Sequence, residues 1–516
     1  MSLAAQRRAA AGWSRAFLIV SIAAAVRLLF ATTIPTLPDE AYYWLWSRNL
    51  APGYFDHPPV IALLIRLGGV LFAPLGLGAT SLAIRLGPIL AGWIAGIATA
   101  AIANRIGGTE AAMRASIIMA VMPLAAAGLV LATPDAGVLA ATGVSLYCLV
   151  RAFESEVGSR ESLRWWMATG LALGAAFTAK YTSIFLPIAV LIAVLIRGEL
   201  RVRLREPGPY IACLLAALVF LPVLLWNAQH QWISFVFQLR HGLSAPQGSA
   251  LLAAWKHEGD FFGGQAALAS PILFIMMGMV VARSFRASAP SVCFALGVVA
   301  LVTFGFFVYS GVRQRVEPNW PAPAYIPAIV LLSTVTLTPR AEKWLRGGIG
   351  LAGAMSFIIY LQALIPILPL KPAKDPIARA FGWTELAAAV DSTANVVRAE
   401  TNRRTWLAGD RYQEASELAL HVPGHPTTFS TNLSGRVNQF DLWAGFPLRA
   451  TGADNLILVV DDSDQPHAAV AALQPYFDEA RRGALVTLRR GRGEIGTRRI
   501  WELRGYHGGW PKRPPT

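Results

Sequence analysis

Long apolar runs separated by short polar segments recur through the first 370 residues of the chain. Many of these runs approach about 20 residues, the length that crosses the hydrocarbon core of a bilayer. A hydropathy reading predicts about eleven membrane-spanning helices. They cover approximately residues 16–34, 82–103, 114–131, 136–152, 165–179, 182–197, 209–226, 265–283, 290–310, 323–338 and 348–368. The pattern therefore predicts an α-helical polytopic membrane protein.

The pattern changes after a proline-rich segment at residues 366–376. Short runs of β-branched and aromatic residues then predict strands, and two amphipathic runs between them predict helices. The strands are expected at 404–410, 426–431, 455–462 and 483–490, and the helices at 411–422 and 466–477. We therefore expect two domains, a membrane domain over 1–370 and a small soluble α/β domain over 371–516, which is of ordinary domain size.

Composition and charge support this class and suggest an orientation. Charged residues make up 15% of the chain, below the roughly 25% of soluble proteins. The net charge of +15 does not indicate nucleic-acid binding, because most arginines lie in short connections between apolar runs. Those connections become cytoplasmic if the N-terminus is cytoplasmic, as the positive-inside rule requires. An odd number of spans then places the C-terminal domain outside the cytoplasm.

An acidic pair, Asp39-Glu40, follows the first apolar run within the sequence "PDEAYYW". The acids could simply favour the start of a helix, where caps and the helix dipole prefer negative charge. They could instead supply a catalytic carboxylate at the membrane surface, beside Tyr42 and Tyr43. Taken alone, the pair favours the capping interpretation.

The next motif is "GYFDHPP", residues 53–59. Its prolines break the chain ahead of an apolar stretch too short to span, which predicts an interfacial helix. Asp56 is either a helix cap or part of a site that Tyr54 also lines. His57 could bind a phosphate or a metal ion.

Further polar residues are expected on the same outer side. Asp135 follows Thr133-Pro134, which is ordinary helix-start chemistry, and Lys180 could snorkel to the interface or pair with a lipid phosphate. Later outer segments contain other candidates, which could equally form an interfacial aromatic belt. These are Arg240, Arg315, Trp320 and Tyr325, together with the possible metal ligands His230 and His241, which join Asp56 and His57 in that role.

The motifs occur in the order "PDEAYYW", "GYFDHPP", "ATPDA" and "TAKYT". This order resembles the GT-C membrane glycosyltransferases, specifically the bacterial branch with the lipid A aminoarabinose transferase and relatives of the protein O-mannosyltransferases. The resemblance covers approximately residues 16–370. It implies transfer of a hexosyl or pentosyl group from a polyprenyl-phosphate-linked donor to a hydroxyl of an envelope lipid, glycan or protein. The reaction would lie on the outer side of the bacterial cytoplasmic membrane and invert the anomeric centre.

The resemblance also implies roles for individual residues. Asp39 matches the general base of the family's first outer loop, and Lys180 matches the lysine of its "TK" motif. Asp56 matches an acidic position that is a glutamate in the lipid A transferase. His57 and Tyr42 depart from that enzyme, which has lysine and arginine there, so its own donor and acceptor do not transfer directly. The remaining roles follow from the chemistry. Glu40 and Asp135 are alternative carboxylates, and Lys180, His57, Arg240 and Arg315 are the cations expected to neutralise the donor phosphate.

Two other classes of function share these features. A transporter or flippase of lipid-linked sugars would use the same cations but needs no base, and an envelope assembly factor would use the C-terminal domain for binding alone. The sequence identifies no certain cofactor and leaves a divalent metal open. The expected partners are the lipid-linked donor, the acceptor and membrane lipids, and not nucleic acid.

Overall fold

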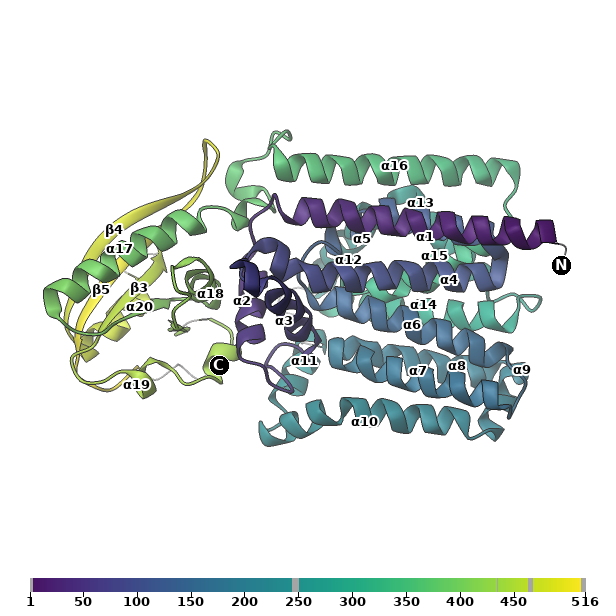
Figure 1. The fold of residues 1–516 in the computed structure, drawn as a ribbon, viewed down its shortest axis with the longest axis horizontal. Helices are drawn as coiled ribbons and strands as arrows, with labels where there is room; N and C mark the ends of the chain where they lie inside the picture. Colours follow the sequence, from purple (N-terminus) through teal and green to yellow (C-terminus); the bar gives the residue numbers. More distant parts are fainter. Residues whose placement is uncertain (1–2, 244–249, 434, 463–466, 512–516) are drawn as a thin grey trace. The chain divides into compact units, whose positions relative to one another are not determined.

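The computed structural model describes residues 3–243, 250–433, 435–462 and 467–511 (Figure 1). The chain divides into two compact units, which are treated separately below. The first, called the helical unit, contains residues 1–32, 51–78 and 82–364. The second, called the sheet unit, contains residues 33–50, 79–81 and 365–516. The sheet unit thus includes a segment, 33–50, that the sequence assigned to the membrane domain.

The helical unit consists of α-helices joined by short connections. Its helices are α1 (Leu3–Ala31), α3 (Val60–Phe72), α4 (Ser81–Val121), α5 (Pro123–Gly128), α6 (Pro134–Glu154), α7 (Arg160–Ala179), α8 (Phe185–Ile196), α9 (Gly198–Arg201), α10 (Gly208–Gln229), α11 (Ile233–Leu243), α12 (Ala250–Ala269), α13 (Pro271–Arg283), α14 (Ser291–Arg313), α15 (Tyr325–Thr334) and α16 (Pro339–Leu364). Short 3₁₀ turns are η1 (Ala73–Leu75), η2 (Tyr181–Ile184), η3 (Val202–Arg205) and η4 (Ala322–Ala324).

The helical unit confirms the prediction that the chain crosses the membrane several times. Among the described residues, six helices are long and apolar enough to cross a bilayer, or up to eight if each of two bent helix pairs is one span. About eleven spans were predicted, and that number stays a prediction. The predicted span 82–103 lies within α4, whereas the predicted span 114–131 covers the end of α4 and all of α5. Helix α4 leaves helical geometry at Gly108, where φ is +74°. The predicted span 323–338 corresponds to the shorter stretch Ala322–Thr334.

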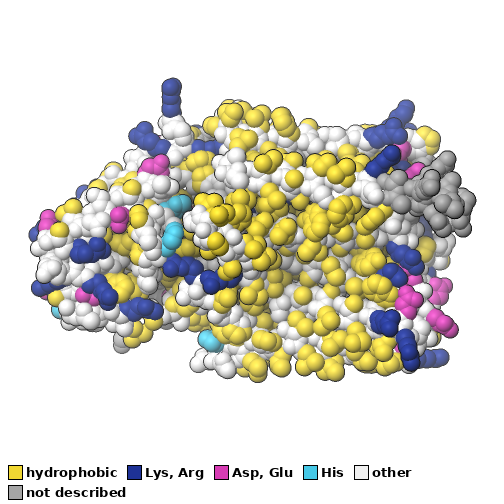
Figure 2. Space-filling view, viewed as in Figure 1, with side chains coloured by type: hydrophobic (Ala, Val, Ile, Leu, Met, Phe, Trp, Pro, Cys, Tyr) yellow, Lys and Arg dark blue, Asp and Glu magenta, His cyan; other side chains and the backbone are white. Residues whose placement is uncertain are grey.

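The outer surface of the helical unit is apolar. Large hydrophobic side chains are exposed along several helices, including Leu18, Ile22 and Leu29 of α1 and Leu214 and Leu218 of α10. Figure 2 shows this apolar surface along the helices, with charged side chains gathered at the end where α1 begins. A surface of this kind is stable only against an apolar environment, so it agrees with a helical membrane region.

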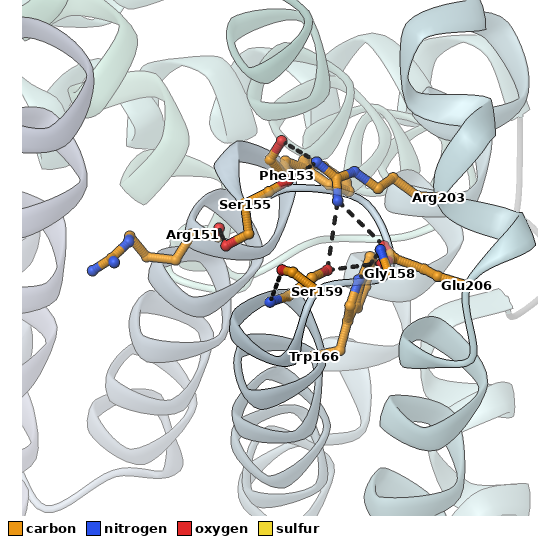
Figure 3. A network of polar contacts seen from close by, with 9 residues as sticks. Arg151, Phe153, Ser155, Gly158, Ser159, Trp166, Arg203 and Glu206 are labelled. Atoms are coloured by element: carbon orange, nitrogen blue, oxygen red, sulfur yellow. Dashed lines mark hydrogen bonds and ion pairs between the residues drawn. The ribbon is translucent and has the colours of Figure 1, made fainter.

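A buried polar network fastens the connection between α6 and α7 to the turn after α9 (Figure 3). The Glu206 carboxylate accepts hydrogen bonds from the Gly158 backbone (2.8 Å), the Ser162 hydroxyl (2.9 Å) and the Trp166 indole (2.8 Å). The Arg203 guanidinium donates to the carbonyl oxygens of Phe153 and Ser155, at 2.7 and 2.6 Å. These bonds satisfy a buried ion pair and carbonyls at a helix end that would otherwise be costly to bury.

The sheet unit is an α/β domain, which confirms the predicted fold class. Its elements are α2 (Pro38–Arg48), α17 (Trp383–Thr401), β1 (Thr405–Gly409), α18 (Tyr412–His421), β2 (Thr428–Ser430), α19 (Phe446–Arg449), β3 (Asn455–Asp461), α20 (Ala468–Leu473), β4 (Phe477–Arg490) and β5 (Gly493–Tyr506). Short 3₁₀ turns are η5 (Pro372–Lys374), η6 (Ala378–Ala380), η7 (Gln439–Asp441) and η8 (Gln474–Tyr476). All four predicted strands and both predicted helices are present, whereas α17 and β5 were not predicted.

The sheet has the order β2-β1-β3-β5-β4. β1 is parallel to both β2 and β3, while β5 is antiparallel to β3 and β4. Side chains alternate between the two faces, as the period of a strand requires. Along β3, Ile457 and Val459 pack with α17 and α18, whereas Leu456 and Leu458 pack with α19 and α20.

Candidate active site

The two acids at the start of α2 have different partners. Glu40 is buried, and its Oε2 accepts the backbone N–H of Leu37 at 2.9 Å, so it caps the helix in the manner of a capping box. Asp39 is half-buried, and its Oδ1 accepts the hydroxyl of Tyr412 at 3.1 Å. In the described part of the chain, the Asp39 side chain accepts no other hydrogen bond. Helix capping therefore accounts for Glu40 and not for Asp39.

The aromatic residues after the acidic pair hold α2 within the sheet unit. Tyr42 is buried, and its hydroxyl accepts the backbone N–H of Gln439 at 2.6 Å. Its ring lies 4.6 Å from the ring of Tyr412 and 5.8 Å from that of Tyr43, centroid to centroid. Tyr42, which was predicted to line the site, is thus a buried aromatic packing residue of the sheet unit.

In the helical unit, Asp135 and Lys180 form a buried ion pair. The Lys180 Nζ lies 2.6 Å from Asp135 Oδ1, and each residue is 8% exposed. The other carboxylate oxygen of Asp135 accepts the side-chain amide of Asn319, also at 2.6 Å. Asp135 is in the first turn of α6, and Lys180 separates α7 from η2. The structure thus brings the predicted site residues Asp135 and Lys180 together. It also adds Asn319, which the sequence interpretation did not single out.

The motif at residues 53–59 forms a compact loop. The Tyr54 backbone N–H donates to the His57 carbonyl at 3.3 Å, and the Tyr54 hydroxyl accepts the Ala51 N–H at 3.0 Å. The carbonyl of buried Asp56 accepts the Gln238 side-chain amide from α11 at 2.6 Å. Burial raises the pKa of Tyr54 to about 12. Asp56 and His57 are therefore fixed in a folded turn rather than in an open loop.

The remaining predicted site residues have separate surroundings. Arg240 is exposed on α11, and exposed Arg315 lies 3.7 Å from Glu317. The hydroxyl of buried Tyr325 donates to Gln265 at 2.8 Å, and the Trp320 ring lies 6.1 Å from that of Phe307.

The possible metal ligands do not form a cluster. His230 stacks on Trp226, and its Nδ1 lies 2.8 Å from the carbonyl oxygen of that residue. The side chain of His241 lies outside the described residues. Among the residues that are described, no three His, Cys, Asp or Glu side chains come together as a metal site would need.

Helix α18 contains two buried acids that the sequence interpretation read only as part of an amphipathic helix. Glu414 is 2% exposed and pairs with Arg498 of β5 at 3.1 Å. Glu417 is 1% exposed, and its Oε2 lies 3.1 Å from the Nε2 of His421. Burial raises the pKa of Glu417 to about 7, and the carboxylates of Glu40 and Asp39 also raise it, against a lowering by His421. The residue spacing within α18 does not reveal the raised pKa of Glu417, because Glu40 and Asp39 of α2, distant in sequence, contribute to it.

These features give a helical membrane protein with acidic and aromatic motifs ahead of an α/β domain, as expected from the resemblance to the GT-C membrane glycosyltransferases. The comparisons agree at the level of sequence. Residues 56–226 match the family model described as dolichyl-phosphate-mannose-protein mannosyltransferase. The chain is 28% identical over 379 residues to the lipid A galacturonosyltransferase RgtD of Rhizobium johnstonii, covering 72% of this chain and 76% of that protein.

The fold agrees as well. The crystal structure of ArnT from Cupriavidus metallidurans in the apo state superposes with a TM-score of 0.63 at 16% identity, covering 96% of this chain and 98% of that one. The same protein bound to undecaprenyl phosphate gives a TM-score of 0.62 at 16% identity, covering 94% and 97%. The resemblance to the GT-C membrane glycosyltransferases is thereby confirmed, and the chain has their fold.

Proposed function

We propose that this protein transfers a sugar from a polyprenyl-phosphate-linked donor to a hydroxyl of an envelope lipid, with lipid A as the leading acceptor. The similarity to a lipid A galacturonosyltransferase over most of both chains supports the acceptor class. The fold shared with a protein that binds undecaprenyl phosphate supports the donor class. Glycans and proteins remain the other acceptor classes with a suitable hydroxyl.

One observation carries the catalytic part of the proposal, the arrangement of Asp39. The helix start is already capped by Glu40, so capping does not explain the acid at position 39. Its Oδ1 is held by Tyr412, and in the described part of the chain no hydrogen bond reaches its Oδ2. A half-buried carboxylate with one oriented oxygen and one available oxygen is suited to act as a general base, worth about 10²–10⁴-fold in rate.

In the proposed step, Asp39 Oδ2 takes the proton of the acceptor hydroxyl. The acceptor oxygen forms a bond to the anomeric carbon, and the bond from that carbon to the phosphate oxygen breaks. Its electron pair leaves with the lipid phosphate. A single displacement of this kind inverts the anomeric centre. Lys180, His57, Arg240 and Arg315 are the proposed cations for the leaving phosphate.

We further propose that the protein lies in the bacterial cytoplasmic membrane, with its N-terminus in the cytoplasm. The arginine-rich connections support this orientation through the positive-inside rule. The residues after 370 would then form an extracytoplasmic domain, on the side where lipid-linked sugars meet envelope acceptors.

The direct test is sugar transfer by the purified full chain in proteoliposomes. Undecaprenyl phosphate linked to galacturonic acid and to aminoarabinose would be supplied separately with lipid A, and lipid A would be analysed by mass spectrometry. The proposal predicts a mass gain of one sugar residue with at least one donor. Movement of the donor across the bilayer without any change in lipid A would favour a flippase instead.

A further inference from the structure

The partner of Asp39 is a residue that neither the motifs nor the comparisons assign to the site. Tyr412 is the first residue of α18 and lies 373 residues from Asp39 in sequence. Both residues belong to the sheet unit, in which α2 packs against α18. The hydroxyl of Tyr412 donates to Asp39 Oδ1 at 3.1 Å.

The Tyr412 side chain is fixed on more than one side. Its ring lies 4.6 Å from the ring of Tyr42, and the guanidinium of Arg436 lies over it, 5.3 Å from the centroid. Tyr42 is itself held by the backbone N–H of Gln439. An aromatic neighbour and a cation over the ring limit its rotation, so the hydroxyl is presented to Asp39 in a defined direction.

A hydrogen bond to one carboxylate oxygen fixes the plane of the whole group. The second oxygen of Asp39 is thereby directed, and a base is effective only within hydrogen-bond reach of the proton that it removes. Small errors in the position of a reacting group can reduce a rate about 10²-fold. Orientation of Asp39 is therefore a function that a single hydroxyl can supply.

We propose that Tyr412 is a positioning residue, whose hydroxyl holds the Asp39 carboxylate in the orientation needed for proton removal. This inference rests on the proposed function, because it acts through Asp39 as the base. It gives the C-terminal α/β domain a direct part in catalysis rather than a role in binding alone.

The test uses the full chain in proteoliposomes with lipid A and whichever undecaprenyl-phosphate sugar supports transfer. Tyr412→Phe keeps the ring and removes the hydroxyl. Loss of a hydrogen bond to a charged group predicts a fall in kcat of about 10- to 100-fold, with KM for the donor unchanged. The matched control is Tyr506→Phe in the same unit, which removes a hydroxyl that donates to the Gly509 carbonyl at 2.7 Å. This control should keep the wild-type kcat.

A double variant separates positioning from general damage. If Tyr412 acts through Asp39, adding Tyr412→Phe to Asp39→Asn causes no further loss, because the two residues work as a unit. Multiplication of the two losses would overturn the inference, as would a rise in KM with kcat unchanged. A normal kcat in Tyr412→Phe, with Asp39→Asn inactive, would overturn the inference alone. A normal kcat in Asp39→Asn would overturn the base as well.

A second substitution covers the case in which Tyr412→Phe does not fold. Replacement of Tyr412 by 3-fluorotyrosine keeps the ring and the hydroxyl but makes the hydroxyl a stronger donor. The inference predicts a changed kcat with KM for the donor unchanged. An unchanged kcat would contradict it.

Discussion

At the scale of single residues, the acidic pair shows what a motif can and cannot specify. The sequence contains two acids at a predicted helix start, and it suggests two roles for them, helix capping and catalysis. It cannot assign the roles, because they depend on side-chain direction and on Tyr412, far away in the chain. The structure places the backbone N–H of Leu37 on Glu40 and the hydroxyl of Tyr412 on Asp39. Roles that differ between adjacent residues can be separated by conservative substitution.

The first prediction concerns Glu40. Glutamine also satisfies a capping box, so Glu40→Gln should retain the helix start and keep sugar transfer within about twofold of wild type. Glu40→Ala should instead lower the free energy of unfolding by about 1 kcal/mol, as loss of a cap does. Transfer rate and thermal unfolding would be measured on the same preparations. A large loss of rate in a stable Glu40→Gln protein would assign the chemistry to Glu40.

The second prediction concerns the Asp135–Lys180 pair. Removing one member of a buried ion pair leaves an uncompensated charge, so Lys180→Ala should lower the free energy of unfolding by about 3–5 kcal/mol. The control is Arg315→Ala, because Arg315 and Glu317 are exposed and such pairs contribute about 0–1 kcal/mol. Denaturant unfolding in detergent provides the comparison. Equal stability of the two variants would contradict a structural contribution from the buried Asp135–Lys180 pair.

At the scale of elements, the hydrophobic pattern predicted secondary structure correctly where a helix or strand buries one face in the core. The four strands and two helices expected after residue 403 are present, because alternation and amphipathicity directly reflect one buried face. Strand β5 was not predicted because its sequence is rich in arginine and glycine. In the structure it forms a long hairpin with β4. The assignment of α2 to the sheet unit was not predictable, since it depends on packing against α18.

The third prediction concerns α18 and pH. The pKa of Glu417 is raised to about 7 in the folded protein, whereas an unfolded glutamate titrates near about 4.3. The folded state therefore binds more protons between these values. The contribution of Glu417 to stability is complete below about pH 4.3 and is lost as pH rises toward 7, by at most about 1.4 kcal/mol per pH unit.

Glu417→Gln removes this titration. The stability of the variant relative to wild type should rise between about pH 4.3 and 7 and be constant above that range. Thermal unfolding of the full chain at several pH values would measure it. Glu385→Gln, at an exposed position on α17, serves as the control and should show no such trend. A Glu417→Gln difference that does not depend on pH would contradict the effect of burial.

At the scale of the whole molecule, the membrane class, the GT-C resemblance and the presence of an α/β domain were predictable from sequence. Apolar run length and the order of four short motifs suffice for that. The number of spans does not follow from apolar run length alone. The chain turns by 111° between the helical segments Tyr181–Ile196 and Gly198–Arg205, and other apolar helices have only 10–17 residues. Site geometry was not predictable, because Asn319 and Tyr412 reach their partners only through the tertiary fold.

The fourth prediction concerns topology. In the proposed orientation, the arginine-rich connections are cytoplasmic and the C-terminal α/β domain lies outside the cytoplasm. Alkaline phosphatase fused after residue 370 should therefore be active, and a cytoplasmic fluorescent reporter fused at the same position should be dark. The opposite pair of results would place the domain in the cytoplasm and contradict the proposed orientation.

The most direct test of the central claim is the rate of sugar transfer to lipid A by wild type and by Asp39→Asn. Asparagine caps a helix as well as aspartate does, but it cannot accept the proton of the acceptor hydroxyl. With thermal stability unchanged, the account predicts a rate at least about 10²-fold below wild type. A normal rate in the folded Asp39→Asn protein would contradict the claim that Asp39 is the base.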